Sequence, residues 1–524
     1  MSASAAPGAA TAAVPGLRRN MVTICAMTAT IMQALDTTIA NVALPYMQGS
    51  LSASQDQVNW VLTSYIVAAA IMTAPVGWVA NRFGRKKVFI VCAAGFTVAS
   101  VMCGLAQDIS QMVLFRLLQG VFGAALVPLS QAVMLDSYAL HERAKAMSIW
   151  GMGVMLGPIM GPSLGAWLTE TYSWHWVFFV NIPFGIVTVA GLVIFMDETK
   201  QNFELKFDWF GFAARAIGIG SIQLALDRGE QLGWLESNEI IAEAIIAIVG
   251  FYYFFAHSLT SSKPFIQFAI FKDKNFVGGC VFMAVMGLVL YSTMALSSPF
   301  LQNVIGYPIL TAGLLLATRG SGTFVAMMLV GRIMKYVEAR TLIMAGMALI
   351  SLGLFFTARW TDQTNVSEII IVSIAQGFGL GLVFVPLSTV AFLTLPNHLR
   401  TDGTSMLTLM RNVASSIGIS LVIAQLTSGT RMAHAVLVEH VTPFNNALQM
   451  PGVREMLDLT TDAGRAMADA MVTLQATIIA FGLDYQMVMV VTLLAIPLAL
   501  MIGSSKAALR AQSKKPDDHA AVLE

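Results

Sequence analysis

The chain has 524 residues, of which 56% are hydrophobic and 11% charged, and its mean hydropathy is +0.72. Soluble domains carry about 25% charged residues, so the composition excludes an ordinary soluble protein and favours one that crosses a membrane many times. The net charge of +1 argues neither for nor against a nucleic-acid partner, and the four cysteines, in apolar segments without ligand-like spacing, indicate neither disulfides nor a metal site.

The chain begins with a segment rich in Ala, Pro and Gly that ends at Arg18-Arg19. A signal peptide carries its positive charge before its apolar core, so residues 1–20 are predicted to be a disordered cytoplasmic tail. A membrane-spanning helix needs roughly 20 apolar residues. Fourteen segments satisfy that requirement: 21–45, 58–80, 88–106, 112–135, 146–168, 176–196, 209–227, 239–258, 276–300, 311–333, 341–358, 368–393, 405–428 and 485–503.

The basic residues orient these segments. With the N-terminus in the cytoplasm, most of the 30 Lys and Arg residues fall in cytoplasmic connections or tails. Basic loops resist translocation, so both termini are expected in the cytoplasm, the C-terminal one as a tail over 504–524. The one long external connection is predicted at 429–484, where short amphipathic helices are expected.

One pattern occurs in both halves of the chain. Residues 118–130 read LQGVFGAALVPLS, and residues 375–388 read AQGFGLGLVFVPLS. The copies lie on the fourth and twelfth predicted helices, so one half repeats the other with a pair of helices inserted between them. The sequence therefore predicts an all-α polytopic membrane protein with an N-terminal six-helix bundle (21–196), an inserted helix pair (209–258) and a C-terminal six-helix bundle (276–503).

Two ionisable residues fall inside predicted helices of the N-terminal bundle. Asp36 is in the middle of the first helix, where an ionised carboxylate costs about 3 kcal/mol, so it is expected to face a cavity or a partner. At ~1.5 Å per residue, Arg116 on the fourth helix lies at a depth from which its side chain could bridge much of the gap to Asp36. The two residues form either a proton-linked pair or a structural ion pair.

Glycines mark two further features. After the second helix the chain reads GWVANRFGRKK over 77–87, and a weaker copy covers 331–340. Glycines there allow a tight turn, and the cations hold it on the cytoplasmic side. The fifth helix has a glycine every fourth residue from Gly153 to Gly165, which gives a smooth face for a neighbouring helix, and its prolines predict a bend. Ordinary membrane packing remains the alternative interpretation of this glycine face.

These motifs resemble those of a known family. The segment 77–87 resembles the loop signature of the Major Facilitator Superfamily, with Asn81 where an Asp is usual. The glycine–proline pattern of the fifth helix resembles the signature of its antiporters, with Gly161-Pro162 in place of Gly-Gly. The string DTTIANVALP, which starts at Asp36, resembles the first helix of the fourteen-helix drug:proton antiporters. The surroundings of Arg319 and Arg411 are similar to those in EmrB-type exporters.

The resemblance implies a proton-coupled antiporter, not an enzyme, that exports amphipathic drugs or other lipophilic compounds across the inner membrane by alternating access. It needs no cofactor besides the proton gradient, and the sequence has no phosphate-binding loop of an ATPase. The implied partners are a periplasmic adaptor of EmrA type and an outer-membrane channel of TolC type, in a tripartite efflux system. An importer of a single metabolite and a non-transporting membrane sensor or scaffold remain as alternatives.

The resemblance also assigns roles to residues. Asp36 and Arg116 are predicted to couple protons. The substrate cavity is predicted to include Gln33, Asn41, Gln119, Asn181, Arg319, Gln376 and Arg411. Gating and conformational roles are predicted for Gly77, Asn81, Arg82, Gly84, Arg85, Asp136, Gly153, Gly157, Pro158, Gly161 and Pro162. Because Asn81 replaces an acid, Asp136 is expected to be the main acidic partner of Arg82 or Arg85.

The charges predicted within the spans also constrain the substrate. Arg116, Arg319 and Arg411 lie clearly within spans, whereas Asp36 is the only well-buried acid expected there. An excess of positive charge attracts carboxylates and phenolates and repels cations, most strongly where water is sparse. The substrates are therefore expected to be neutral or weakly acidic lipophiles.

Overall fold

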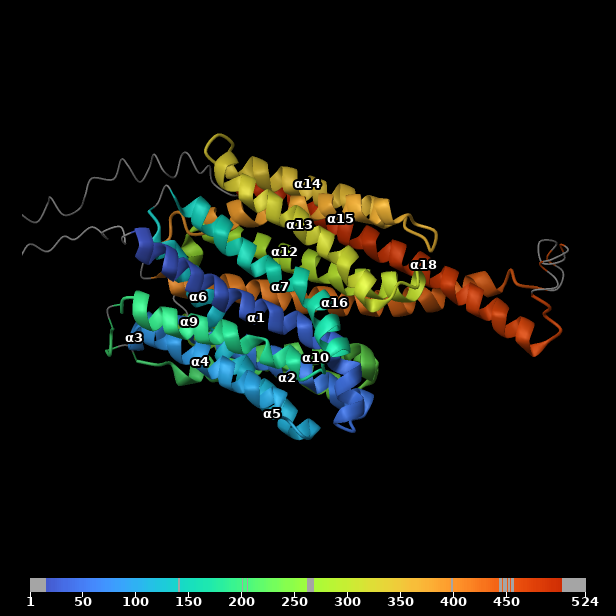
Figure 1. The fold of residues 1–524 in the computed structure, drawn as a ribbon, viewed down its shortest axis with the longest axis horizontal. Coiled ribbons are helices and arrows are strands. Elements are labelled where there is room, and N and C mark those ends of the chain that lie inside the picture. Colours follow the sequence, from blue (N-terminus) through green and yellow to red (C-terminus); the bar gives the residue numbers. More distant parts are fainter. Residues whose placement is uncertain are drawn as a thin grey trace, which may run out of the picture.

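The structure is a computed structural model that describes residues 16–501 apart from short gaps at 140–141, 200, 205, 262–267, 397–398, 443–444, 446–449, 451–452 and 454–456. Within these ranges the regular elements are all helices. Most of the long helices run along one axis of the molecule (Figure 1). The first helix already begins at Gly16, inside the segment predicted to be a tail.

The N-terminal half contains six rods, three of which are divided into two segments. Their bounds are α1 (Gly16–Ser50), α2 (Gln55–Thr73), α3 (Val76–Phe83), α4 (Arg85–Gly104), α5 (Ile109–Gly123), α6 (Leu126–Ser137), α7 (Arg143–Thr171), α8 (Trp176–Phe179) and α9 (Asn181–Phe195).

The inserted pair and the C-terminal half follow. The pair consists of α10 (Trp209–Leu232) and α11 (Asn238–Thr260), joined through η2 (Trp234–Glu236). The remaining elements are η3 (Phe268–Lys272), α12 (Lys274–Pro299), η4 (Phe300–Val304), α13 (Ile309–Ile333), α14 (Ala339–Thr357), α15 (Val366–Val390), α16 (Arg400–Val438), α18 (Asp462–Ala495) and η6 (Ile496–Met501).

Prolines lie at or close to the breaks of two of the divided rods. The rod of α2 and α3 bends by 55°, and Pro75, which has no N–H to donate, stands at the break as the N-cap of α3. The helix break between α5 and α6 lies just before Pro128. The second copy of the repeat nevertheless lies in one continuous helix, α15, which includes Pro386. The repeat thus keeps its position in both halves while the local helix geometry differs.

Twelve helices of the described chain are long and apolar enough to cross a membrane, and the bent α2–α3 rod raises the number to 13. The one predicted span not among these 13 is 146–168, which corresponds to α7, a continuous helix of 29 residues. A helix of that length extends about 43 Å, which exceeds a bilayer core. Its glycines and prolines keep its mean hydropathy low, and it packs between α1 and α13. A helix therefore occupies each predicted span of this multi-pass membrane protein, although composition alone supports at most 13.

The segment 429–484 differs from the expectation of short amphipathic helices. The helix α16 continues to Val438 and α18 begins at Asp462, so two long helices account for most of it. Figure 1 shows this pair projecting beyond the other helices on the right-hand side. Polar residues such as Arg431 and Asp469 interrupt the apolar pattern, so the sequence does not predict long helices here. Pro443 and Phe444 lie outside the described residues.

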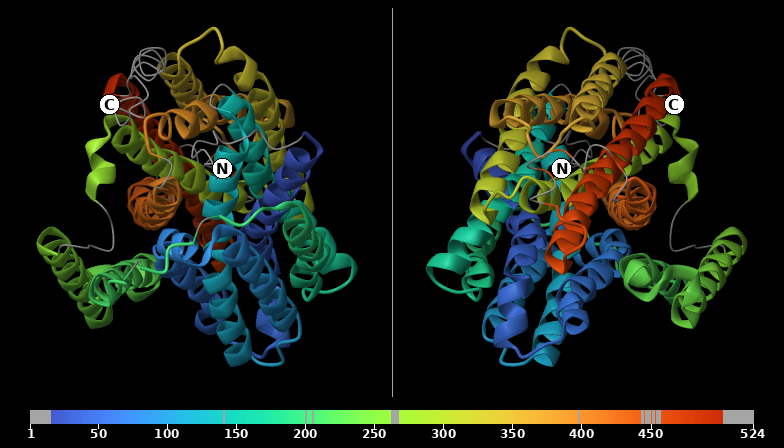
Figure 2. Two further views of the ribbon diagram at one scale, coloured as in Figure 1. Left: turned by 90° about the vertical axis from the view of Figure 1, so that its left-hand side faces the viewer. Right: turned by 90° about the vertical axis from the view of Figure 1, so that its right-hand side faces the viewer.

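The two halves meet along α7 and α13, which run antiparallel, because the start of α13 faces the later part of α7 and its end faces the start of α7. A Cβ added at Gly313 would lie 3.4 Å from Ser163, and one added at Gly331 would lie 3.6 Å from Ser148. The inserted pair lies at the periphery of both halves (Figure 2). There α10 contacts α2 of one half and α16 of the other, and Gln223 Nε2 donates a hydrogen bond of 2.6 Å to Ser416 Oγ. The inserted pair is thus placed across a seam between the halves.

Candidate functional site

A completely buried carboxylate lies near the centre of the N-terminal half. Asp36 on α1 and Arg116 on α5 are both fully buried, and Arg116 Nη1 donates a hydrogen bond of 2.7 Å to Asp36 Oδ2. Gln119 Nε2 and Asn181 Nδ2 donate to the other oxygen, Oδ1, at 2.8 and 3.2 Å. Charge-assisted hydrogen bonds of this kind offset the cost of removing a carboxylate from water. The structure thus joins four of the sequence-predicted site residues in one network.

Arg116 is also held by groups other than Asp36. Its Nε donates to the carbonyl oxygen of Val61 at 2.9 Å, and its Nη1 donates to Gln119 Oε1 at 2.7 Å. Its guanidinium carbon lies 4.3 Å from the centroid of the Tyr65 ring, within the range of a cation–π contact. Gln33 joins the network at its edge, because Gln33 Nε2 donates to the Tyr65 hydroxyl at 3.2 Å. These contacts keep Arg116 in place whether or not Asp36 carries a charge.

The glycine face of α7 seats the helix that carries Asp36. A Cβ added at Gly157 would lie 2.3 Å from the carbonyl carbon of Ala34, and one added at Gly161 would lie 2.0 Å from Thr38 Oγ1. At Gly153, further along the same face, the nearest atom would be 3.6 Å away, an ordinary contact. Close approach of α1 and α7 therefore requires glycine at 157 and 161.

The prolines of α7 leave it as one continuous helix through residues 143–171. Pro162 is partly buried, whereas the side chain of Pro158 lies outside the described residues. The two prolines therefore do not divide the rod as the prolines of α3 and α6 do.

The C-terminal half contains a second polar network. Arg319 Nη1 on α13 donates to Thr293 Oγ1 at 2.9 Å, and Arg319 Nη2 donates to Gln376 Oε1 on α15. Gln376 Nε2 in turn donates to Thr357 Oγ1 at 2.8 Å. Gln376 occupies the same position in the second copy of the sequence repeat as Gln119 does in the first. Each half thus holds an arginine against a repeated glutamine, with Arg116 fully buried and Arg319 partly buried. Among the described contacts, only the N-terminal network includes a carboxylate.

The end of the bundle at which α1 begins and α3 lies is called here the basic end. Asp136, at the end of α6, forms ion pairs with Arg85 of α4 and with Arg400 Nη1 of α16, the latter at 2.7 Å. Of the two expected partners of Asp136, the structure places Arg85 against it, whereas Arg82 stacks over the ring of Trp78 at 5.3 Å. The contact with Arg400 joins the two halves.

The loop signature supplies close contacts at the same end. A Cβ added at Gly77 would overlap the carboxylate of Asp402 at 1.6 Å, which shows how tightly α3 and α16 meet. Gly84 has a φ of +93°, a conformation that L residues rarely adopt. The carbonyl oxygen of Asn81 accepts a hydrogen bond from the backbone N–H of Asn202 at 3.1 Å. The motif therefore shapes the contact between α3 and α16 and the turn into α4.

Two predicted cavity residues lie outside both networks. Asn41 on α1 is exposed, and Arg411 on α16 is largely buried, with a buried Nε that has no hydrogen-bond partner among the described residues. The expectation that Asp36 is the only well-buried acid is wrong, because Asp484 on α18 is also completely buried. Sequence reasoning missed Asp484 because it placed the last span at 485–503, one residue too late to include it.

Sequence reasoning also left Arg400 among the cytoplasmic basic residues without a role. An arginine four residues after Pro396, in a short connection between two apolar segments, gives little sequence signal of its own. Arg400 and Asp136 are 264 residues apart in the sequence. Their ion pair can be recognised only in the folded structure, where α6 and α16 come together. The signal that could have indicated it is the unpaired Asp136 at the end of an otherwise apolar helix.

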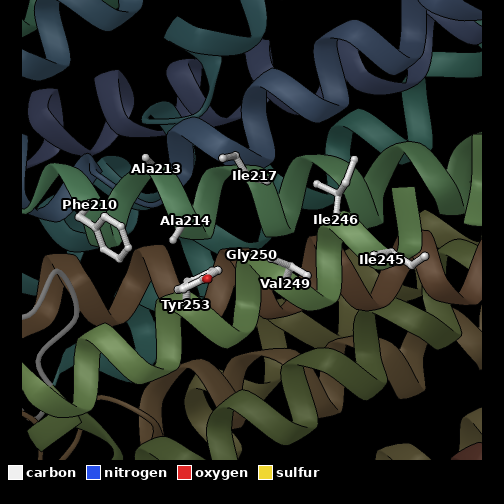
Figure 3. Close-up of a pocket in the computed structure, with 9 residues that line it drawn as sticks. All are labelled: Phe210, Ala213, Ala214, Ile217, Ile245, Ile246, Val249, Gly250 and Tyr253. Atoms are coloured by element: carbon white, nitrogen blue, oxygen red, sulfur yellow. The ribbon is translucent and has the colours of Figure 1, made fainter. Parts of the chain in front are cut away.

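A pocket of about 300 Å³ lies between α10 and α11 (Figure 3). Its lining is apolar except for the hydroxyl of Tyr253 and consists of Phe210, Ala213, Ala214, Ile217, Ile245, Ile246, Val249, Gly250 and Tyr253. Several of these side chains are about half exposed, on the outer surface of a membrane protein. The pocket contains no residue of either polar network, so it is an apolar surface groove separate from the candidate site.

The comparisons with known proteins agree with this architecture. The family model described as Major Facilitator Superfamily matches residues 26–419. The chain is 33% identical over 467 residues to the multidrug export protein EmrB of Escherichia coli K12, covering 88% of this chain and 91% of that protein. It is also 33% identical to the fatty acid resistance protein FarB of Neisseria gonorrhoeae, over 82% of this chain and 84% of that protein.

Solved structures share the fold at much lower sequence identity. The human organic anion transporter MFSD10 matches with a TM-score of 0.56 and 11% identity, over 91% of this chain and 99% of that chain. The proton:xylose symporter XylE matches with a TM-score of 0.55 and 14% identity, over 90% and 95% of the two chains. From the family match, the EmrB relatives and the shared fold, the chain belongs to the Major Facilitator Superfamily and, within it, to the EmrB-type multidrug exporters.

Proposed function

We propose that the protein is a proton-coupled antiporter that exports lipophilic compounds across the inner membrane. The observation that carries the proposal is the fully buried Asp36–Arg116 pair, with an N···O distance of 2.7 Å. Protonation of Asp36 would remove the charge to which Arg116, Gln119 and Asn181 donate, and so weaken the contact of α1 with α5 and α9. A change in protonation would thereby bias the equilibrium between two conformations.

We propose alternating access as the transport cycle, with the basic end in the cytoplasm. The ion pair between Asp136 and Arg400 and the hydrogen bond from Ser148 to the carbonyl oxygen of Met327 both join the two halves toward that end. Opening a path to the cytoplasm must break these contacts. The conformation described here is therefore assigned to a state closed on the cytoplasmic side.

The proposed substrates are neutral or weakly acidic lipophiles. Arg319 is held by the neutral side chains of Thr293 and Gln376, and the Nε of Arg411 is buried without a hydrogen-bond partner among the described residues. A positive interior attracts anionic head groups. The name of the relative FarB, a fatty acid resistance protein, supports the same chemistry. Resistance should therefore extend to long-chain fatty acids and weak-acid uncouplers, measured in a host that lacks its own exporters. Protection against quaternary ammonium compounds alone would contradict the assignment.

The experiment that tests the coupling uses purified protein in proteoliposomes. An imposed pH gradient, acidic inside, should drive accumulation of a fluorescent weak-acid substrate against its concentration gradient, because inward substrate movement is exchanged for outward protons. Dissipating the gradient with an ionophore should abolish accumulation. Equal accumulation with and without the gradient would contradict proton coupling and favour a uniporter.

We further propose a tripartite assembly with a periplasmic adaptor and an outer-membrane channel. The projecting α16–α18 pair bears exposed apolar side chains, among them Met432 (71% exposed), Val436 (55%) and Met471 (47%), far from the basic end. Apolar side chains exposed on a projecting helix pair are typical of surfaces that a partner covers. A photo-crosslinker at position 432 should capture the adaptor in native membranes, with position 336 at the basic end as the control. Equal capture at both positions would contradict the proposed contact.

A further inference from the structure

A second acid is buried in the C-terminal half, and neither the transport scheme nor the sequence analysis uses it. Asp484 on α18 is completely buried, and neither carboxyl oxygen has a hydrogen-bond partner among the described residues. Asp36, equally buried, accepts hydrogen bonds from three side chains, one of them a cation. The two acids therefore have opposite surroundings.

The surroundings decide the protonation state of Asp484. An ionised carboxylate buried in a membrane protein without a partner costs several kcal/mol, so such a group takes up a proton and becomes neutral. No ion pair of the described chain reaches Asp484. The lack of a partner for either carboxyl oxygen of Asp484 therefore favours the neutral acid over the carboxylate in this conformation.

The ionisable groups on the helices packed against α18 do not change that conclusion. The helix contacts α12, α14 and α16, and also η4 and η6, which carry no ionisable side chain. The ionisable side chains of these helices and of α18 itself are Lys274, Cys280 and Tyr291 on α12, Arg340 on α14, Arg400, Asp402, Arg411, Arg431 and His434 on α16, and Asp462, Arg465, Asp469 and Tyr485 on α18. A further cation near this region is Arg319 of α13, which interacts electrostatically with Tyr485. Its guanidinium donates hydrogen bonds to Thr293 and Gln376 and forms no ion pair with Asp484 among the described contacts.

The position of Asp484 connects it with parts that must move. One turn before Asp484, Ala480 packs against Gly429 of α16. A Cβ added at Gly429 would lie 3.4 Å from the Cβ of Ala480. The adjacent Tyr485 hydroxyl shares a hydrogen bond of 3.1 Å with Ser297 of α12. The helix α16 also carries Arg400, which forms the ion pair between the halves at the basic end. Opening of that end therefore displaces a helix that packs against α18.

We propose that Asp484 is a second proton-carrying group, neutral in the closed conformation and deprotonated when movement of α16 admits water to it. In that step the O–H bond of the carboxylic acid breaks, the proton passes to water, and the carboxylate remains until a proton from the opposite side restores the acid. The inference rests on the proposed proton-coupled export. It adds a second proton site in the half that has no carboxylate in its Arg319 network.

The alternative is an acid that stays neutral throughout the cycle and only fills space. Asparagine resembles a neutral carboxylic acid in size and polarity, so Asp484→Asn separates the two roles. A permanently neutral acid tolerates this change without effect on transport, whereas a proton carrier does not. Asp469→Asn is the matched control, because Asp469 is an exposed acid on the same helix, paired with His434 at 3.0 Å.

The experiment combines a spectroscopic and a transport measurement on full-length purified protein. Infrared difference spectra should show a protonated-carboxyl C=O band that disappears in Asp484→Asn and persists, shifted, in Asp484→Glu. In proteoliposomes the number of protons released per substrate should fall in Asp484→Asn and stay unchanged in Asp469→Asn. The Glu variant also keeps the inference testable if the Asn variant does not fold, because it retains a titratable group.

Two outcomes would overturn the inference. One is an infrared spectrum without a carboxyl band assignable to Asp484, which means that the acid is ionised. The other is an unchanged number of protons per substrate in Asp484→Asn. If the wild-type protein itself moves substrate without protons, the proposed function fails, and the infrared band still reports on Asp484 separately.

Discussion

Neutralising Asp136 should loosen the closed basic end. Its carboxylate lies between Arg85 and Arg400, whose side chains are only 9% and 7% exposed, while its own side chain is 34% exposed. Asp136→Asn leaves these two cations, one from each half, without the acid between them. The change therefore removes an attraction between the halves and adds a repulsion.

The size of the effect follows from the burial of the pair. An exposed ion pair contributes at most about 1 kcal/mol, and removing one partner of a fully buried pair costs about 3–5 kcal/mol. A partner that is one-third exposed falls between these limits, so we expect about 1–2 kcal/mol, which shifts the ratio of closed to open states roughly five- to thirty-fold. The shift should appear as a rise in the open population.

Cysteine labelling measures that population. Ser148 is 4% exposed and faces Met327 across the halves, so a Ser148→Cys reporter, in a background without the four native cysteines, is protected while the basic end is closed. A charged thiol reagent added to inside-out vesicles should label it roughly ten times faster in Asp136→Asn, since labelling follows the open population when closing is fast.

Three further variants make the result decisive. Arg400→Gln should give a similar rise, and combining it with Asp136→Asn should add less than the sum of the two, because both remove the same contact. Asp197→Asn is the control, since Asp197 pairs with Arg18 within one half and is 73% exposed. Unchanged labelling in both Asp136→Asn and Arg400→Gln would refute the proposed role of the pair.

Three more outcomes are expected. Gly157→Ala should lower the melting temperature in detergent, by overpacking worth about 1–3 kcal/mol, whereas Gly153→Ala should not, because the new methyl group overlaps α1 at 157 and makes an ordinary contact at 153. Gly84→Ala should also destabilise the protein, by about 1–3 kcal/mol, because its φ of +93° with a ψ of 139° is a conformation that residues with a Cβ rarely adopt, and the loss should appear as reduced yield of folded protein. Arg319→Met should reduce resistance to fatty acids more than resistance to neutral compounds, and equal losses would count against an electrostatic role.

The helices and the pairing of Asp36 with Arg116 could be predicted from the sequence, because both depend on features of short sequence segments. Apolar stretches of sufficient length, the repeat over 118–130 and 375–388, and a lone mid-membrane acid are all visible without tertiary contacts. Arg319 and Gln376 are each predicted as cavity residues, but the sequence does not predict their contact. It does not indicate the partner Thr293 either, because a threonine in an apolar helix has no distinctive pattern.

The failures are equally specific. Sequence reasoning placed the last span at 485–503, because it judged the helix from the apolar pattern alone, and the error removed Asp484 from the membrane. In the structure α18 is stabilised by packing against α16 along a length that includes polar residues, which hydropathy does not detect. The contact between Asp136 and Arg400 likewise depends on how the two halves meet, which no local pattern encodes.

The most direct test is the release of protons on addition of substrate to purified protein in a weakly buffered solution. The wild-type protein should release protons as substrate binds, because substrate and proton are proposed to compete through the Asp36–Arg116 network. Asp36→Asn should fold and still bind lipophilic substrates that do not contact Arg116. The number of protons released when substrate binds to this variant should be lower than for the wild-type protein. Proton release by Asp36→Asn equal to that of the wild-type protein would contradict the proposed coupling.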